Sequence, residues 1–535
     1  MLNIFDHPIP GQLELIHVVE SDDVFLEESD VIWFRVLRDL DWRLLLDAAV
    51  QYYEALWQFN RDQSQEQSRK RDGAPLEPNP ETREQARQRL LQSRCTLDPS
   101  QPILAANDTV PLEPIHVNPD TIRPGHPPLR LSGRAPKDFF AMLNAFLGVM
   151  IMGRPGEPEF ASAELTNNPA FARTCGFTLY DAERGYRASD VPSRRKLEQF
   201  DQIMTANGLW GHVSVKQVRQ NLESGMLELT TIGVHDTTHY HAFSSMEVPV
   251  VEGQTKNGKP LKKSHPKTTK GCRCPQWEGC SHPWISADEG AGTVVKAGRK
   301  MYWAHKCSTF ALSGLVEIPL DAVAMMDAAS HDSRSLIAHL ERIGKLYPQV
   351  MSQLKIVLDD SALDDQVIRQ ELMDRFGLEL IVEPNHRGRK AILSDLPKGI
   401  EHITSGGTPV CQAGFPFDLL GSRQNSEQFL FRAPDDADDI PVCTGCPQRS
   451  NCIRSTAQYR HLSISFARLP FIDQEFPHLS KLFKRLTAKR TVIERVQKLM
   501  KFDFGDDRLS KRGTLAYQAI LDKTLFAMHV VLAIA

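Results

Sequence analysis

The order of apolar segments after residue 226 constrains the fold of this chain more than any other feature. Runs typical of β-strands cover residues 227–234, 301–312, 317–326, 354–358 and 378–382. Helical patterns lie between them, over residues 330–347 and 365–376. Strands that alternate with helices in this way predict a mixed α/β fold, in which helices cover a mixed sheet.

The sequence before this region has a different pattern. Helical periodicity over residues 30–65 predicts an N-terminal helical segment within residues 1–72. Residues 73–136 are rich in proline and predict a linker. Residues 137–222 predict a helical domain that begins with an apolar helix over residues 137–152.

One helix of this domain starts with a group of cations. Ser193 is a predicted N-cap, and the first turn after it reads Arg194, Arg195, Lys196. Cations at a helix N-terminus oppose the helix dipole, so an external anion has to compensate for them. DNA phosphates would do so, as in helix-turn-helix modules. The alternative is an ordinary helical bundle with surface arginines.

A second basic segment lies near the C-terminus. The net charge of the 535 residues is −4, yet residues 481–501 contain eight Lys or Arg and one Glu. At 3.6 residues per turn, one face of a helix carries four charged residues: Arg490, Glu494, Lys498 and Lys501. This face suits an anionic polymer held beside a metal-binding carboxylate. The alternative is a solvated amphipathic helix with locally paired charges.

Acidic residues follow two of the apolar strands. Asp236 comes after the strand over residues 227–234, and Asp359 with Asp360 comes after the strand over residues 354–358. If the two strands are neighbours, these carboxylates converge at the rim of the sheet, and Glu494 is the predicted third ligand. Carboxylates in one place repel unless divalent cations neutralise them. Two Mg²⁺ (or Mn²⁺) ions would suit phosphodiester chemistry. Taken singly, each Asp is a turn or cap residue.

Seven of the ten cysteines fall into two clusters. In the first, Cys443-x2-Cys446-x5-Cys452, with Cys411 as a fourth thiolate, predicts a structural Zn²⁺ site. Such a site would fold residues 391–480, which otherwise read as irregular with little core of their own. Free thiols and an Fe–S cluster are the alternatives.

The second cluster lies in a basic segment, residues 251–298. Four residues are its candidate ligands for a second zinc ion: Cys272, Cys274, Cys280 and His282. The alternative is a basic loop with incidental thiols.

The C-terminal signature resembles that of bacterial insertion-sequence transposases of the Asp-Asp-Glu superfamily, whose members carry Tyr-x2-Arg-x3-Glu-x6-Lys. Arg490, Glu494 and Lys501 match this motif, whereas Thr487 stands at the tyrosine position. The resemblance covers most of residues 137–535.

The two aspartate motifs carry the same resemblance. Asp236-Thr237-Thr238 is similar to the family's Asp-Gly-Thr. Asp360-Ser-Ala-Leu363-Asp364 is similar to Asp-x-x-Tyr-Asp, with Leu in place of Tyr, and this register favours Asp360 over Asp359.

The resemblance implies an RNase H-like catalytic core with a five-stranded mixed sheet. The core would begin at residues 223–390, continue after the cysteine-rich insertion over residues 391–480, and end in the helices of residues 481–535. The implied activity is two-metal-ion cleavage at the ends of an insertion sequence and strand transfer to target DNA.

The resemblance also assigns roles to residues and partners. Asp236, Asp360 and Glu494 would hold the metal ions, and Arg490, Lys498 and Lys501 would bind DNA phosphates. The partners would be double-stranded DNA, both terminal inverted repeats and target, and a second copy of the chain on paired ends.

The expected location is the bacterial cytoplasm, at the nucleoid, because the N-terminus lacks a signal peptide and the longest apolar run, residues 525–535, is too short to span a membrane. That run predicts a buried terminal helix. Three alternatives to a transposase stay open: a nuclease that cuts without joining, a zinc-containing DNA-binding regulator, and an inactive transposase relic.

Overall fold

The computed structural model describes residues 30–71, 104, 117–126, 136–177, 191–243, 288, 290–296, 300–326, 328, 332–385, 390–453, 456–505 and 507–534. Most of the predicted linker and the basic segment of residues 251–298 lie outside these ranges. The chain forms two compact units. Unit 1 comprises Met1–Thr230, Thr237–Gln353 and Ile493–Ala535, and unit 2 comprises Thr231–Asp236 and Leu354–Val492. This division cuts across the predicted domains.

The N-terminal part of unit 1 is helical, as predicted. Its principal helices are α2 (Asp30–Asp39), α3 (Leu46–Arg71), α5 (Phe139–Ile151), α6 (Pro158–Asn167), α7 (Pro169–Thr174), α8 (Arg194–Ala206) and α9 (Leu209–Glu223). Helix α5 is buried along nearly its whole length because almost all of its side chains are apolar. Aromatic rings join the helices: the Phe146 and Phe200 centroids lie 5.7 Å apart, and those of Phe200 and Trp210 lie 5.9 Å apart.

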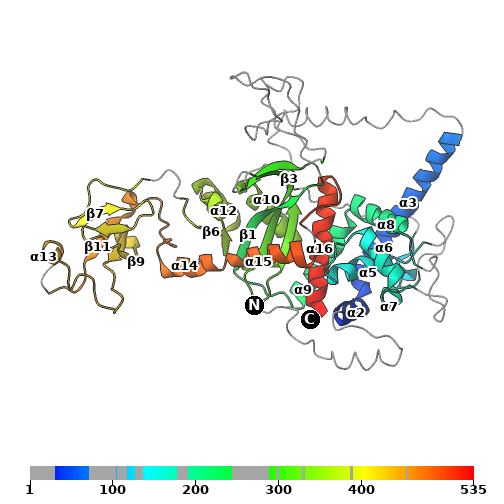
Figure 1. Ribbon diagram of the computed structural model, residues 1–535, viewed down its shortest axis with the longest axis horizontal. Coiled ribbons are helices and arrows are strands. Elements are labelled where there is room, and N and C mark those ends of the chain that lie inside the picture. Colours follow the sequence, from blue (N-terminus) through cyan, green and yellow to red (C-terminus); the bar gives the residue numbers. More distant parts are fainter. Residues whose placement is uncertain are drawn as a thin grey trace, which may run out of the picture. The chain divides into compact units, whose positions relative to one another are not determined.

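The C-terminal helix α16 (Thr514–Ile534) belongs to the core of unit 1, and Figure 1 draws it in red. It packs against α9 and against strand β4 (Pro319–Ala324). Its length and apolar composition would allow it to cross a membrane, but 83% of the apolar stretch is buried inside the protein. The prediction of a buried terminal helix is therefore confirmed.

The central sheet is mixed, as predicted. Its path runs β2-β3-β1-β5-β6, and β4 pairs with β3 as a sixth strand. The other strands are β1 (Ile232–His241), β2 (Gly292–Lys296), β3 (Lys300–Leu312), β5 (Ile356–Asp359) and β6 (Glu379–Val382). Strands β1, β5 and β6 are parallel neighbours, whereas β3 is antiparallel to β2 and β4.

Helices cover the sheet in both units. In unit 1, α10 (Ser333–Leu346) packs on β3, and in unit 2, α12 (Gln366–Phe376) and α14 (Lys481–Ala488) pack on β6. One boundary was predicted wrongly: β1 begins at Ile232 and continues through Asp236 to His241.

The prediction that residues 391–480 are irregular is wrong. This part of unit 2 contains β7 (Ile400–Ile403), β8 (Pro409–Cys411), β9 (Asp418–Arg423), β10 (Gln428–Arg432) and β11 (His461–Ser465). They form a three-stranded sheet, β11-β10-β9, and a two-stranded sheet, β7-β8, labelled in part in Figure 1. Every second residue of β10 and β11 faces a hydrophobic cluster that includes Phe429, Phe431, Leu462 and Ile464. The segment therefore has a core of its own.

Phe429 is the residue on which that core can be tested. Its side chain is fully buried, and its ring lies 4.6 Å from that of Phe466. We expect Phe429→Ala to destabilise unit 2 by about 3–5 kcal/mol, because it leaves a cavity between the sheet and Phe466. The measurement is urea unfolding of the full chain. Leu420→Ala, at a position that is 52% exposed, is the control and should change the midpoint little.

Candidate functional site

The parallel pairing of β1 with β5 bears on the placement of two of the predicted carboxylates in unit 2. Ile232 pairs with Ile356, Gly233 with Val357, and Val234 with Leu358. The residues that follow these pairs, His235 and Asp359, are joined by a hydrogen bond between their side chains. Asp360 still has extended backbone angles, φ −87° and ψ 172°. One residue beyond this hydrogen bond, an extension of the register would set Asp236 beside Asp360, at a strand spacing of about 4.8 Å.

Asp236, in the middle of β1, and Asp360, directly after β5, are both half-buried. Arg490 lies 3.8 Å from the Asp236 carboxylate and partly compensates its charge. Asp360 caps the short 3-10 helix Ser361–Leu363, and its Oδ1 accepts a hydrogen bond of 2.8 Å from the Ala362 backbone N–H. This contact fixes the direction of the carboxyl group and leaves Oδ2 for a further ligand.

Beneath these carboxylates lies a buried pair that the sequence analysis did not single out. His235 and Asp359 are 0% and 2% exposed, and a hydrogen bond of 2.5 Å joins His235 Nδ1 to Asp359 Oδ2. Asp359 Oδ1 accepts from the Asp360 backbone N–H at 2.7 Å. Burial raises the pKa of Asp359, and the neighbouring His235 limits the rise. Asp359 is therefore an internal partner, and Asp360 is the accessible carboxylate.

The signal for this pair was present in the sequence. His235-Asp236 and Asp359-Asp360 each place two polar residues in succession at the end of an apolar strand. Since successive side chains of a strand point to opposite faces, one member of each doublet had to point inward. A buried histidine and a buried aspartate on adjacent strands are natural partners.

The helix that carries Glu494 is α15 (Thr491–Lys498), and Glu494 is exposed on it, as is Lys498. The predicted apolar face is correct: Val492, Ile493, Val496 and Met500 are buried, and Leu499 is half-buried. Glu494 belongs to unit 1, whereas Asp236 and Asp360 belong to unit 2.

Lys501 does not lie on the same regular face as Glu494. After Lys498 the helix widens into a π-helix over Leu499–Asp503, which rotates Lys501 away from the predicted stripe. Its ammonium donates to the His239 carbonyl in β1 at 2.5 Å, lies 3.3 Å from Asp507, and sits 4.7 Å from the Tyr240 ring centroid. The side chain is 11% exposed, so Lys501 holds the helix to β1 and does not project as a surface cation.

Helix α14 gives unit 2 a basic surface, which we define by Lys481, Lys484, Arg485 and Lys489, all exposed. Phe483 and Leu486 are buried on the opposite face of α14. The hydroxyl of Ser480 caps the helix by accepting from the Phe483 N–H at 3.1 Å. The cations are thus presented by a fixed element.

The predicted cationic turn of α8 is exposed but locally paired. Ser193 occupies the N-cap position without a side-chain cap hydrogen bond. Arg194 lies 2.9 Å from Glu198 and 3.3 Å from Glu159, and Lys196 donates to Gln199 at 2.9 Å. Arg195 is exposed on the same turn. Protein carboxylates thus compensate for part of the charge that was expected to need an external anion.

The four cysteines of the insertion line one cavity of about 30 Å³ in unit 2: Cys411, Cys443, Cys446 and Cys452. Cys411 ends β8, and Cys452 ends the short helix α13 (Arg449–Cys452). None of the four forms a disulfide in the part of the chain that the structure describes. Burial raises the pKa of Cys452, and the three other thiols add to this rise against the opposing effect of Arg460.

The backbone around this cavity leaves room for sulfur. Gly399 has a φ of +82°, and a Cβ there would lie 2.7 Å from Cys452 Sγ, so a side chain at this position would displace the thiol. Arg449 donates to the carbonyls of Cys443 and Ala457 at 2.9 and 2.7 Å, which fixes the loop that carries Cys443 and Cys446.

Within the described ranges, no group of three or more His, Cys, Asp or Glu side chains is arranged so that it could hold a metal ion. The four thiols nevertheless line one cavity. The other predicted zinc ligands, Cys272, Cys274, Cys280 and His282, lie outside the described residues.

The buried pair beneath the site gives a stability prediction. His235→Leu should destabilise unit 2 by about 3–5 kcal/mol, because Asp359 loses its partner in a buried environment. The double variant His235→Leu/Asp359→Leu should recover most of this loss, since neither buried polar group then remains. Urea unfolding of the two variants and the wild type measures the difference. Equal destabilisation by the single and double variants would contradict a coupled pair.

Comparison with models of known protein families and with curated proteins finds no match to this chain.

Proposed function

We propose that this protein is a DNA transposase of the Asp-Asp-Glu type, which cleaves the ends of an insertion sequence and joins them to target DNA. One observation supports the proposal: β1 and β5 pair in parallel up to Val234 and Leu358, and this register, extended by two residues, would make Asp236 and Asp360 neighbours on one face of the sheet. Two adjacent carboxylates on parallel strands, in a protein with a basic helix, would suit the hydrolysis and transfer of phosphodiesters.

The residues around this pair suit Mg²⁺ or Mn²⁺. Both donors are carboxylates, which hard divalent cations prefer, and Asp360 Oδ2 is left for a ligand by the described contacts. When bound, a pair of such ions would lower the pKa of the attacking oxygen and stabilise the leaving oxygen. Arg490 limits the repulsion between the carboxylates when no ion is bound.

Glu494 is the proposed third carboxylate. Glu494 lies in the chain between Arg490 and Lys501, and both of these residues contact β1. Arg490 lies beside Asp236, and Lys501 donates to the His239 carbonyl. These two contacts support the assignment of Glu494. Because Arg490 is engaged with Asp236 and Lys501 is largely buried, we assign both to ordering the site. Lys498, which is exposed, is the DNA contact of this helix.

The basic surface of α14 is the proposed track for the DNA backbone. Four exposed cations on a packed helix can contact phosphates, and each contact would release condensed counterions. The exposed turn of Arg194, Arg195 and Lys196 in unit 1 is a second proposed DNA contact. The ion pairs of Arg194 with Glu159 and Glu198 would weaken its attraction to phosphates. Binding to paired ends would involve a second copy of the chain. We place the protein at the bacterial nucleoid, because its proposed substrate is DNA.

The four-cysteine cavity is proposed as a structural Zn²⁺ site. Its volume of about 30 Å³ suits one ion, four thiolates supply the softest common donor set, and Gly399 keeps the space beside Cys452 open. Because the insertion has its own hydrophobic core, this site would fix the loops of residues 441–453 and would not be needed to fold the whole segment. A second zinc site at Cys272, Cys274, Cys280 and His282 is proposed from the sequence alone.

Cleavage by carboxylate variants tests the catalytic proposal. Asp236→Asn and Asp360→Asn should each reduce Mg²⁺-dependent strand cleavage by on the order of 10²–10³-fold, because the amide cannot supply an anionic ligand. The substrate is a labelled duplex that carries the DNA flanking the coding region, and gel electrophoresis separates cut strands from joined strands.

Asp374→Asn, on the exposed surface of α12, is the matched control and should cut normally. Normal cutting by both site variants would refute the catalytic role. DNA binding without cutting by wild type and variants alike would favour a zinc-containing regulator or an inactive relic, and cutting without joined product would favour a nuclease.

Metal content tests the zinc site. Elemental analysis of the purified wild type should find at least about one Zn²⁺ per chain, and Cys446→Ser should lower this by about one. Cys175→Ser, at a buried cysteine of unit 1, should leave the content unchanged. An unchanged zinc content in Cys446→Ser would rule out the four-thiolate site. Visible absorbance together with bound iron would show that the cysteines hold an Fe–S cluster and not zinc.

A further inference from the structure

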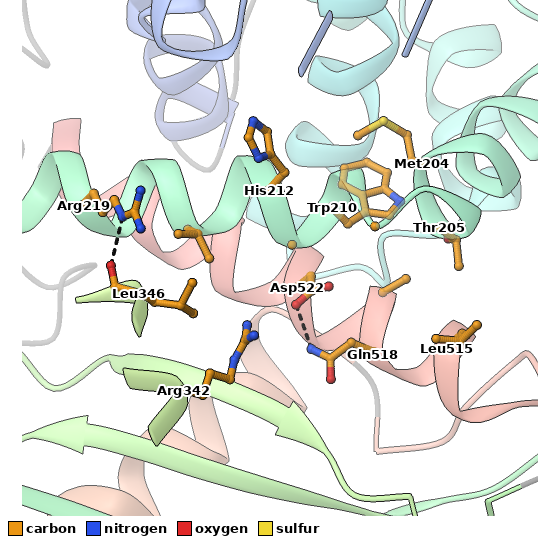
Figure 2. Close-up of a pocket in the computed structure, with 14 residues that line it drawn as sticks. Met204, Thr205, Trp210, His212, Arg219, Arg342, Leu346, Leu515, Gln518 and Asp522 are labelled. Atoms are coloured by element: carbon orange, nitrogen blue, oxygen red, sulfur yellow. Dashed lines mark hydrogen bonds between the residues drawn. The ribbon is translucent and has the colours of Figure 1, made fainter. Parts of the chain in front are cut away.

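Unit 1 contains a cavity that plays no part in the proposed chemistry. It has a volume of about 250 Å³ and lies among α8, α9, α10 and α16 (Figure 2). Its apolar wall includes Met204, Val215, Leu346, Leu515 and Ala519. A space of this size suits a small organic molecule and is too small for a DNA duplex.

A buried carboxyl group opens onto this cavity. Asp522 in α16 is 8% exposed, and its Oδ1 accepts a hydrogen bond of 2.8 Å from Gln518 Nε2. Its Oδ2 faces Gly211 of α9, where a Cβ would lie only 3.1 Å away. The absence of a side chain at Gly211 therefore leaves Asp522 Oδ2 accessible from this side. Gln518 is held in turn by the Ala324 N–H and the Ala322 carbonyl, at 2.7 and 3.2 Å, so the carboxyl group cannot easily turn aside.

A guanidinium group lies on the facing wall. Arg342 of α10 extends toward the Gln518–Asp522 pair in Figure 2. Its Nε donates to Asp321 Oδ2 at 2.7 Å, which orients the planar group. The two terminal nitrogens of Arg342 have no hydrogen-bond partner among the described residues. An oriented guanidinium of this kind binds carboxylate or phosphate through both terminal nitrogens. Arg219 lines the rim, where its Nε donates to the Leu346 carbonyl at 3.0 Å.

We propose that this cavity binds a small organic anion through a carboxylate or phosphate group. Arg342 binds this group, and Asp522 donates a hydrogen bond to it. The apolar wall would hold the carbon skeleton of the ligand. The proposal goes beyond the transposase function, because every lining residue belongs to unit 1 and none is a proposed metal or DNA ligand.

Such a site should bind its anion together with a proton. Burial raises the pKa of Asp522 to about 7, against the lowering effects of Gln518, Arg342 and Lys523. The charged and titratable groups on the elements packed around it include Arg342 of α10, Tyr347 at the end of α10, Asp321 of β4, His212 and Arg219 of α9, Asp201 of α8, and Lys523 of α16. An anion favours the neutral carboxyl, so binding is strongest below pH 7 and is lost as the pH rises through this value.

Calorimetric titration with sulfate at constant ionic strength tests the proposal, because the charge of sulfate does not change between pH 6 and 8. We expect binding at pH 6 and an affinity about tenfold lower at pH 8, as one linked proton requires. Asp522→Asn, which always offers a donor, should bind with little pH dependence. Arg342→Lys keeps the charge beside Asp321 but loses the paired donors, and should bind at least about tenfold more weakly.

Lys345→Ala, at an exposed cation of the same helix, is the control and should bind as the wild type does. Parallel titrations at pH 6 with succinate and glycerol 3-phosphate distinguish a carboxylate ligand from a phosphate ligand. Absence of sulfate binding, an unchanged affinity in Arg342→Lys, or displacement of sulfate by a short DNA duplex would each overturn the proposal. None of these outcomes bears on cleavage by Asp236 and Asp360.

Discussion

The parallel pairing of β1 with β5 is the constraint on which the functional account depends. The residues after the last pair of this register, His235 and Asp359, share a buried hydrogen bond. This bond constrains the positions of the next residues, Asp236 and Asp360. If the register slipped by one residue, the faces would exchange, and a charged carboxylate would enter the core. The cost of burying an unpaired charge therefore protects the positions of Asp236 and Asp360.

The long elements could be predicted from the sequence because their apolar periodicity extends over several turns. This holds for α3, α5 and α16, whose buried faces are continuous. The second half of β1 could not be predicted in the same way, because His235 to His241 is almost entirely polar and resembles a turn. Its strand conformation comes from pairing with β3, which lies far along the chain. The strands β7 to β11 have three to six residues each, too few to establish a period.

The sequence predicted which types of residue form the candidate site, but it predicted their geometry less well. The sequence predicted that the strands before Asp236 and Asp360 are neighbours, and β1 and β5 do pair in parallel. The inward role of Asp359 depends on its pairing with His235, which only the register reveals. Lys501 was assigned to a DNA-facing stripe on the assumption of a regular helix, and the π-helix over Leu499–Asp503 moves it into contact with β1.

The cysteines illustrate how sequence spacing and tertiary structure complement each other. Cys443, Cys446 and Cys452 are close in sequence, whereas Cys411 comes from a different strand pair, yet all four line the same cavity. Their loops are attached to a segment with its own hydrophobic core. Folding of this part of unit 2 therefore does not depend on the proposed zinc ion, in contrast to small zinc domains that unfold without metal.

The most direct test of the central claim is the binding of Mn²⁺ to the purified protein, followed by electron paramagnetic resonance. If Asp236 and Asp360 share a divalent cation, the wild type should bind Mn²⁺, each Asn variant should bind it much more weakly, and Asp374→Asn should bind it normally. Equal Mn²⁺ binding by the wild type and by the Asp236→Asn/Asp360→Asn double variant would contradict the account.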